Sequence, residues 1–210
     1  MAVNSDAITA FVNCFTPGNA NYGNVGSLMT TVFSPEGGTG ANEVPVLAIT
    51  NHGLGIGPAF YGARRVRKVF NRLFNAFPDV QLMPISGSPN PPFPLLTSSD
   101  GNTIALQVTI TGTHQDWWFS RADPDRFYSK PLSDIAPTNQ TLSQDPNYPV
   151  AACAVFTFNG TSHLVNQLAM YLDRYKFIEN LSPGQGTTLN AFVSANIAPP
   201  TAAEHHERRR

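Results

Sequence analysis

The stretch from Thr103 to Trp118 places the strongest constraint on how this chain can fold. Apolar and polar residues alternate along it, and every second position is apolar at Ile104, Leu106, Val108 and Ile110. A period of two predicts a β-strand with one buried and one polar face. Continued in the same parity, the buried face reaches Gly112, His114 and Asp116.

Two interpretations of His114 follow from this parity. If the strand stays regular, an imidazole and the Asp116 carboxylate project from the buried face, which is costly unless they are hydrogen-bonded or used in chemistry. If the strand ends at Gly112, His114 is a core histidine with satisfied hydrogen bonds and Asp116 is a turn residue.

Length and composition exclude several classes of function. The chain has 210 residues, of which 13% are charged, and a net charge of −1. We therefore expect one domain with a sizeable core and no nucleic-acid partner, because there is no basic field. No apolar run approaches the about 18 residues of a membrane span. Cys14 and Cys153 have no CxxC spacing and fit reduced core residues, and no signal peptide is visible, so we expect a cytoplasmic protein.

The order of the predicted elements indicates an α+β fold. Helices are expected after a cap at Ser5 or Asp6 and over Asn24–Phe33 and Ala63–Ala76, the last ending at Pro78. Strands are expected around the central one, over Val44–Thr50, Val80–Ile85, Val150–Phe158 and Val165–Tyr175. Helices set apart from a mainly antiparallel sheet are typical of α+β domains, whose curved sheets leave a cavity for small ligands.

Two segments stand apart from this pattern. Phe119 to Pro149 has little periodicity but carries Phe127, Tyr128, Leu132, Ile135 and Leu142, so we expect an ordered flap over the cavity or against a partner subunit. We place one domain in residues 1–180, with 119–149 as an insertion, and a C-terminal extension in 181–210 whose distal part is disordered.

Several short motifs resemble those of SnoaL-like polyketide cyclases. The segment Gly62 to Val80 (GARRVRKVFNRLFNAFPDV) is similar to the helix and following strand of that family. Further matches follow in the expected order at Gly112–His114 (GTH), Phe156–Gly160 (FTFNG) and Tyr171–Arg174 (YLDR), and together they cover roughly residues 5–178.

The resemblance implies a nuclear-transport-factor-two-like fold, a cone of curved antiparallel sheet closed by N-terminal helices and commonly dimeric through the sheet. Proteins of this fold include polyketide cyclases, ketosteroid isomerase, scytalone dehydratase, limonene epoxide hydrolase and proteins without catalysis, so the fold does not settle the function. In the cyclases, the histidine of the GTH strand and an aspartate before the FxF turn perform acid–base chemistry. His114 matches the first, but the second position holds Ala154.

Two functions remain open at this stage. The first is a cofactor-independent enzyme acting on an apolar carbonyl compound by cyclisation, isomerisation or dehydration, with His114 as acid/base and Asp116 or Asp173 as its orienter. The second, favoured by Ala154, is a protein that binds an apolar small molecule without chemistry. Candidate ligand-binding residues are Tyr22, Asn51, His52, Trp117, Trp118 and Tyr171. No spaced metal-ligand set or dinucleotide motif is present, so we expect no metal or cofactor. The family resemblance implies an apolar small-molecule partner and a homodimer.

Overall fold

The computed structural model describes residues 2–38, 43–51, 59–85, 95–116, 138–144, 149–172 and 174–181. Along the chain its elements are α1 (Ala2–Asn13), α2 (Val25–Thr31), β1 (Val46–Asn51), β2 (Ala59–Tyr61), α3 (Ala63–Ala76), β3 (Gln81–Pro84), β4 (Leu95–Thr97), β5 (Thr103–Thr113), β6 (Thr141–Leu142), β7 (Val150–Phe158), β8 (Val165–Leu172) and α5 (Arg174–Leu181).

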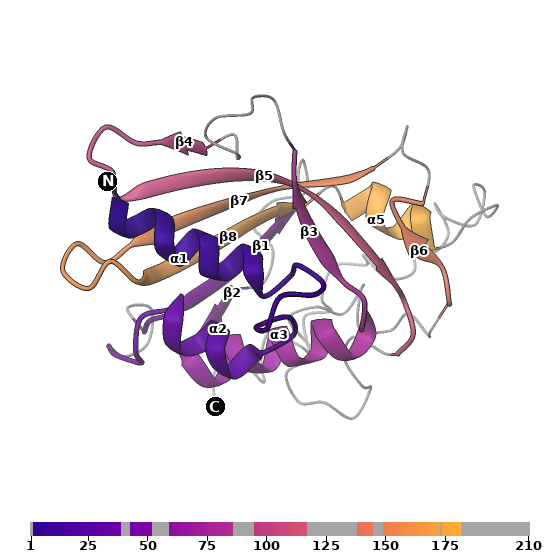
Figure 1. The fold of residues 1–210 in the computed structure, drawn as a ribbon, viewed down its shortest axis with the longest axis horizontal. Helices are drawn as coiled ribbons and strands as arrows, with labels where there is room; N and C mark the ends of the chain where they lie inside the picture. The colour runs from indigo at the N-terminus through magenta and orange to yellow at the C-terminus, as the bar shows by residue number, and fades with distance from the viewer. Residues whose placement is uncertain are drawn as a thin grey trace, which may run out of the picture.

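The strands form one strongly curved sheet, and α1, α2 and α3 lie against its inner side (Figure 1). The strand order is β2-β1-β8-β7-β5-β3, and β4 and β6 also pair with β5. All pairings between the named strands are antiparallel except that of β1 with β8. The predicted α+β class, a curved and mainly antiparallel sheet packed on helices, is confirmed.

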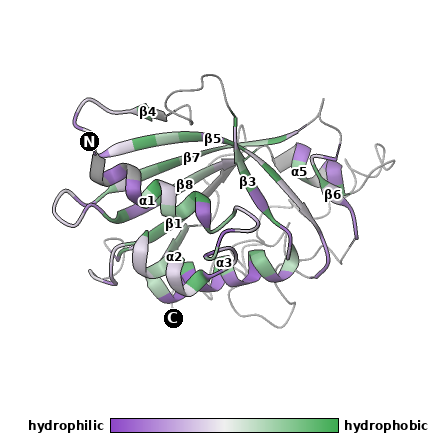
Figure 2. Cartoon of the chain, viewed as in Figure 1, coloured by the Kyte–Doolittle hydropathy of each residue, from purple (hydrophilic) through white to green (hydrophobic). Residues whose placement is uncertain are grey.

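The alternation that predicted the central strand is confirmed in β5. Ile104, Leu106, Val108 and Ile110 are buried, whereas Gln107 between them is exposed. On the same face, Leu106 lies opposite Ala154 of β7. In Figure 2 the long strands β5 and β7 carry extended hydrophobic stretches, whereas α3 carries both hydrophobic and hydrophilic residues.

Phenylalanine rings join the helices to the sheet. The ring of Phe11 in α1 lies 5.0 Å from that of Phe15 and 5.1 Å, edge to face, from Phe156 in β7. Phe15 stacks on Phe74 of α3 at 5.0 Å. Such edge-to-face and stacked pairs stabilise an aromatic core beyond the burial of their surface. This cluster fixes α1 and α3 across the sheet.

The predicted helix from Ala63 to Ala76 has those bounds in α3. The first helix begins earlier than predicted, at Ala2 rather than after a cap at Ser5 or Asp6. The reason is a tertiary contact, because the buried Asn4 amide donates to the Gly101 carbonyl at 2.7 Å and Asn4 Oδ1 contacts His163 Nδ1 at 3.2 Å. These bonds hold the first helical turn in place.

The predicted strand from Val165 to Tyr175 is too long. β8 ends at Leu172, and Arg174–Leu181 form the helix α5. Phe177 and Leu181, one helical turn apart, are both buried, so packing of this helical face decides the conformation. Within the predicted flap, residues 138–144 are described and contribute β6. Residues 117–137, 145–148 and 182–210 lie outside the described residues, so the division at residue 180 is not tested.

Candidate functional site

A small apolar cavity lies between the helices and the concave face of the sheet. Its volume, counted as the space open to the centre of a water molecule, is about 70 Å³. Fourteen apolar residues line it: Phe11, Phe15, Leu47, Val69, Phe70, Leu73, Phe77, Val80, Leu82, Ile110, Leu142, Met170, Leu172 and Phe177. They come from α1, α3, α5, five strands and the turns after α1 and α3, so segments from most of the described chain build the site.

No polar side chain of the described residues lines this cavity. The buried polar residues in that part of the chain are Asn4, Ser34 and His114. Ser34 Oγ donates to Asn166 Oδ1 at 2.7 Å, and Asn4 bonds to Gly101. Each of these polar groups is therefore satisfied by the protein itself, as buried polar groups usually are.

His114 is buried, as the parity of β5 predicted, with 1% of its surface exposed. Its ring stacks on Phe77 at a centroid distance of 5.0 Å. The backbone N–H of Thr138 donates to His114 Nδ1 at 3.3 Å, and Thr138 Oγ1 lies 3.3 Å from the same nitrogen. Because Nδ1 accepts a hydrogen bond, the neutral ring carries its proton on Nε2.

The backbone around His114 is tied to the start of β6. His114 N–H donates to the Gln140 carbonyl at 3.0 Å, and Asn139 N–H donates to the His114 carbonyl at 2.9 Å. Beyond them, Gly112 and Thr113 pair with Leu142 and Thr141. The imidazole thus lies beside the backbone hydrogen bonds that connect residues 138–142 to the end of β5.

Burial favours the neutral form of His114. Desolvation lowers the pKa of His114, while a hydrogen bond with the Asp116 backbone and the charge of Asp116 oppose the shift in part. An imidazole with a lowered pKa is uncharged at neutral pH and acts in the protein as a hydrogen-bonding group.

The prediction that Asp116 shares the buried face with His114 is wrong, because Asp116 is exposed. β5 ends at Thr113, and the chain then turns back onto the end of α3. Gln115 N–H donates to the Ala76 carbonyl at 2.8 Å, and Asp116 N–H lies 3.4 Å from the same oxygen. The last carbonyls of a helix have no partner within the helix. Because Gln115 and Asp116 turn toward the Ala76 carbonyl, they no longer follow the alternation of β5.

Ala154, at the position that the family resemblance gives to an aspartate, is fully buried between Leu106 and Met170. No Asp or Glu is buried among the described residues. The strand that should carry the acid/base carboxylate therefore presents a methyl group.

Two candidate ligand-binding residues lie away from the cavity lining. The Tyr22 hydroxyl donates to the carbonyls of Pro78 and Val80, both at 3.1 Å, and burial together with the charge of Asp79 raises the pKa of Tyr22. Tyr171 is 42% exposed, opposite Cys153 on β7.

The remaining sequence candidates are described only in part or not at all. Asn51 ends β1 opposite Leu172, with only its backbone described. His52, Trp117, Trp118 and Asp173 lie outside the described residues.

None of the fourteen lining residues was among the ligand-binding candidates of the sequence, although Leu142 belonged to the flap expected to cover the cavity. The spacing of Phe177 and Leu181 is a helical signal that could have found α5. Leu142 lies within the loop-rich segment and carries no periodic signal. Among the described residues no group of three or more His, Cys, Asp or Glu side chains could hold a metal ion. None of the helices in that part of the chain is long and apolar enough to cross a membrane.

Comparison with known proteins shows the fold. No protein-family model matches the sequence, and no curated protein is detectably similar to it. Among solved structures, a protein from Jannaschia sp. CCS1, provisionally named a SnoaL-like polyketide cyclase, is 12% identical, with 87% of this chain and 93% of that chain covered and a TM-score of 0.53.

Two further structures are similar over most of the chain. A protein from Xanthomonas campestris pv. campestris, provisionally named a polyketide cyclase, is 13% identical, with 86% of this chain and 98% of that chain covered and a TM-score of 0.54. A phenazine biosynthesis-related protein from Pseudomonas aeruginosa is 10% identical, covers 86% of each chain and has a TM-score of 0.52. These likenesses confirm the expected SnoaL-like fold, and one fold serves several functions.

Proposed function

We propose that this protein binds a small apolar molecule in the cavity and performs no acid–base chemistry on it. The observation that supports this most directly is the lining, in which all fourteen residues are apolar. Among the described lining residues, a bound carbonyl compound would find no hydrogen-bond donor to stabilise an enolate. Acid–base catalysis needs a group within hydrogen-bond reach of the reacting atoms.

The hydrogen bonds of His114 support the same proposal. Its Nδ1 is occupied by Thr138, and its ring is covered on one face by Phe77. Phe77, not His114, contributes to the lining. His114 therefore serves to hold residues 138–142 against β5, and Leu142 of that segment closes part of the cavity.

The lining also indicates the chemical class of the ligand. Five of its members are phenylalanines, namely Phe11, Phe15, Phe70, Phe77 and Phe177. Aromatic faces and edges favour a ligand that contains a ring. At about 70 Å³ the cavity is smaller than the about 150 Å³ of an engineered apolar cavity that holds benzene. We therefore expect a compact hydrocarbon-like molecule, for which lining side chains adjust.

Binding of benzene and naphthalene, followed by ligand-observed NMR, tests the proposal. We expect saturable binding of at least one of the two compounds. The dissociation constant should change by no more than about twofold in His114→Gln, because His114 does not line the cavity. The absence of binding, together with an unchanged thermal midpoint at saturating ligand, would refute the proposal.

A second candidate is the acid–base enzyme. The solved structures provisionally named polyketide cyclases favour it, as does the position of His114 directly behind Phe77. In this alternative His114 acts on a polyketide or terpenoid carbonyl, with Asp116 or Asp173 as its orienter. Turnover of a matched substrate that is lost in His114→Ala would establish it, whereas undiminished turnover would exclude His114.

The composition of the sheet supports a homodimer. None of the described strands contains Asp, Glu, Lys or Arg. On the face opposite the cavity, Ala105 and Val155 form one cross-strand pair, and both are partly exposed. Tyr171 and Met83, 42% and 44% exposed, add apolar surface. Faces depleted of charge are typical of protein–protein contacts, and we propose a second copy of the chain as the partner.

A further inference from the structure

Two residues of the cavity lining, on different elements, are partly exposed. Twelve of the fourteen lining residues are buried, and the two that are partly exposed are Leu73 and Met170. Leu73 lies in the last turn of α3 and Met170 near the end of β8. Because exposed surface on a lining residue marks contact with solvent, these two residues stand at the mouth.

The next lining residues along both elements are covered. Phe77 lies one helical turn after Leu73 and is 1% exposed, and Leu172 lies two residues after Met170 on the same strand face and is 4% exposed. Phe177 of α5, itself buried, contacts the ring of Phe77 edge to face at 5.8 Å. α5 therefore covers the lining residues that lie next to Leu73 and Met170.

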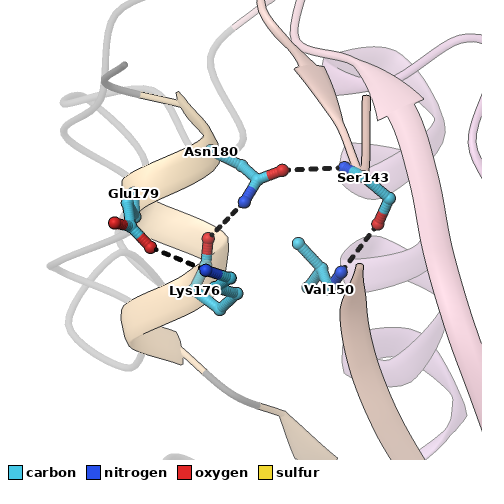
Figure 3. A network of polar contacts seen from close by, with 5 residues as sticks. All are labelled: Ser143, Val150, Lys176, Glu179 and Asn180. Atoms are coloured by element: carbon cyan, nitrogen blue, oxygen red, sulfur yellow. Dashed lines mark hydrogen bonds and ion pairs between the residues drawn. The ribbon is translucent and has the colours of Figure 1, made fainter. Parts of the chain in front are cut away.

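Polar contacts hold α5 in this position. Asn180 Oδ1 accepts a hydrogen bond from Ser143 N–H at 2.8 Å, and Asn180 Nδ2 donates to the Lys176 carbonyl at 3.0 Å (Figure 3). Ser143 Oγ in turn accepts from Val150 N–H at 2.7 Å and donates to the Ile110 carbonyl at 2.7 Å. In Figure 1, α5 and β6 lie together at one end of the sheet. The helix is thus fixed to the ends of β5 and β7.

We propose that apolar ligands enter between Leu73 and Met170, and that Phe177 sets the largest ligand admitted. This inference rests on the proposed binding function. Methionine suits such a mouth, because its unbranched side chain adapts to different shapes. Phe177 suits a size filter, because its rigid ring is held against Phe77 by the packing of α5. The expected ligands are therefore single-ring compounds in the wild-type protein.

Binding kinetics of benzene and of the larger N-phenyl-1-naphthylamine test the inference. Met170→Trp should slow association of benzene at least about tenfold by filling the mouth, and Phe177→Ala should strengthen binding of the larger compound at least about tenfold relative to benzene. The matched control is Gln167→Trp, an exposed position on the same strand, which should change neither. Leu73→Trp blocks the mouth from its other side and serves if Met170→Trp does not fold.

The outcomes separate the two proposals. If the wild-type protein binds benzene and both mouth variants bind it at the wild-type rate, the ligand enters elsewhere and the inference is wrong. If Phe177→Ala leaves the preference between the two compounds unchanged, Phe177 is not the size filter. If neither compound binds to the wild-type protein or to Phe177→Ala, the binding function itself fails.

Discussion

A methyl group at Gly112 should destabilise the protein more than one at the other glycines considered below. Gly112 has a φ of 149°, in a region that L side chains rarely adopt. A Cβ there would lie 3.0 Å from Val80 Cα, 3.3 Å from Phe77 Cβ and 3.4 Å from Val80 Cβ. The nearest of these atoms belongs to backbone, so the turn after α3 must shift to accommodate it.

The expected cost of Gly112→Ala has three parts. Backbone strain contributes about 2 kcal/mol, and the overlap with Val80 and Phe77 contributes about 2 kcal/mol. Alanine also lowers the conformational entropy of the unfolded chain, which offsets about 0.7 kcal/mol of this cost. The free energy of unfolding should therefore fall by about 3 kcal/mol, a large share of the about 5–15 kcal/mol typical of domains. Since Phe77 and Val80 line the cavity, ligand binding should weaken as well.

Urea unfolding followed by far-UV circular dichroism measures this loss. Two glycines provide matched controls, because a Cβ at Gly101 or Gly160 meets nothing within 4 Å. Gly101 has a φ of 72°, so Gly101→Ala should cost about 1 kcal/mol through backbone strain alone. Gly160→Ala should be neutral or stabilising by about 0.4–1 kcal/mol. If Gly112→Ala matched Gly160→Ala within about 0.5 kcal/mol, β5 would not pack against the turn at residues 77–80.

Three further predictions concern the ends and the outer face of the sheet. The pKa of His114 is lower in the folded than in the unfolded state. As the pH falls through about 6.5, the unfolded chain therefore binds a proton before the folded protein does. The free energy of unfolding should decrease from that pH towards the folded-state pKa. Urea unfolding between pH 8 and pH 5 checks this, and the slope should be smaller in His114→Gln. Asp79 accepts hydrogen bonds from Thr113 N–H at 2.6 Å and Thr113 Oγ1 at 2.8 Å, so Asp79→Ala should lower the free energy of unfolding by about 1–2 kcal/mol at pH 7, and an unchanged value would exclude a stabilising role. Sedimentation should give twice the 22.7 kDa of the chain for the wild-type protein and a monomer for Val155→Arg, and a wild-type monomer at micromolar concentration would contradict the dimer.

Sequence patterns predicted the parts of the fold that local periodicity determines. The alternation in β5 gave the burial of His114 correctly, and the helical stripe before Pro78 gave both ends of α3. The pattern misjudged Asp116, since a strand parity persists only while the chain stays in the sheet. Here the backbone leaves the sheet at Gln115, whose N–H donates to the Ala76 carbonyl.

Tertiary contacts decided the parts that the sequence could not give. The sequence prediction extended the strand to Tyr175, yet β8 ends at Leu172, and the burial of Phe177 and Leu181 favours a helix over Arg174–Leu181. The cavity is a stronger case, because its lining is drawn from segments between Phe11 and Phe177. Each of these residues reads as ordinary core in its own segment, and only their convergence makes a site.

The burial of the His114 imidazole has a physical explanation that does not require catalysis and can be tested. Thr138 N–H, beside the end of β5, needs an acceptor, and His114 Nδ1 provides one without charge at 3.3 Å. A carboxylate in that place would pay a larger desolvation cost. His114→Gln keeps a neutral acceptor, whereas His114→Leu leaves Thr138 N–H unpaired, which costs about 1–3 kcal/mol. Urea unfolding at pH 7 should therefore rank the wild-type protein above His114→Gln and His114→Leu last. Equal stability of the two variants would show that this hydrogen bond does not hold residues 138–142 in place.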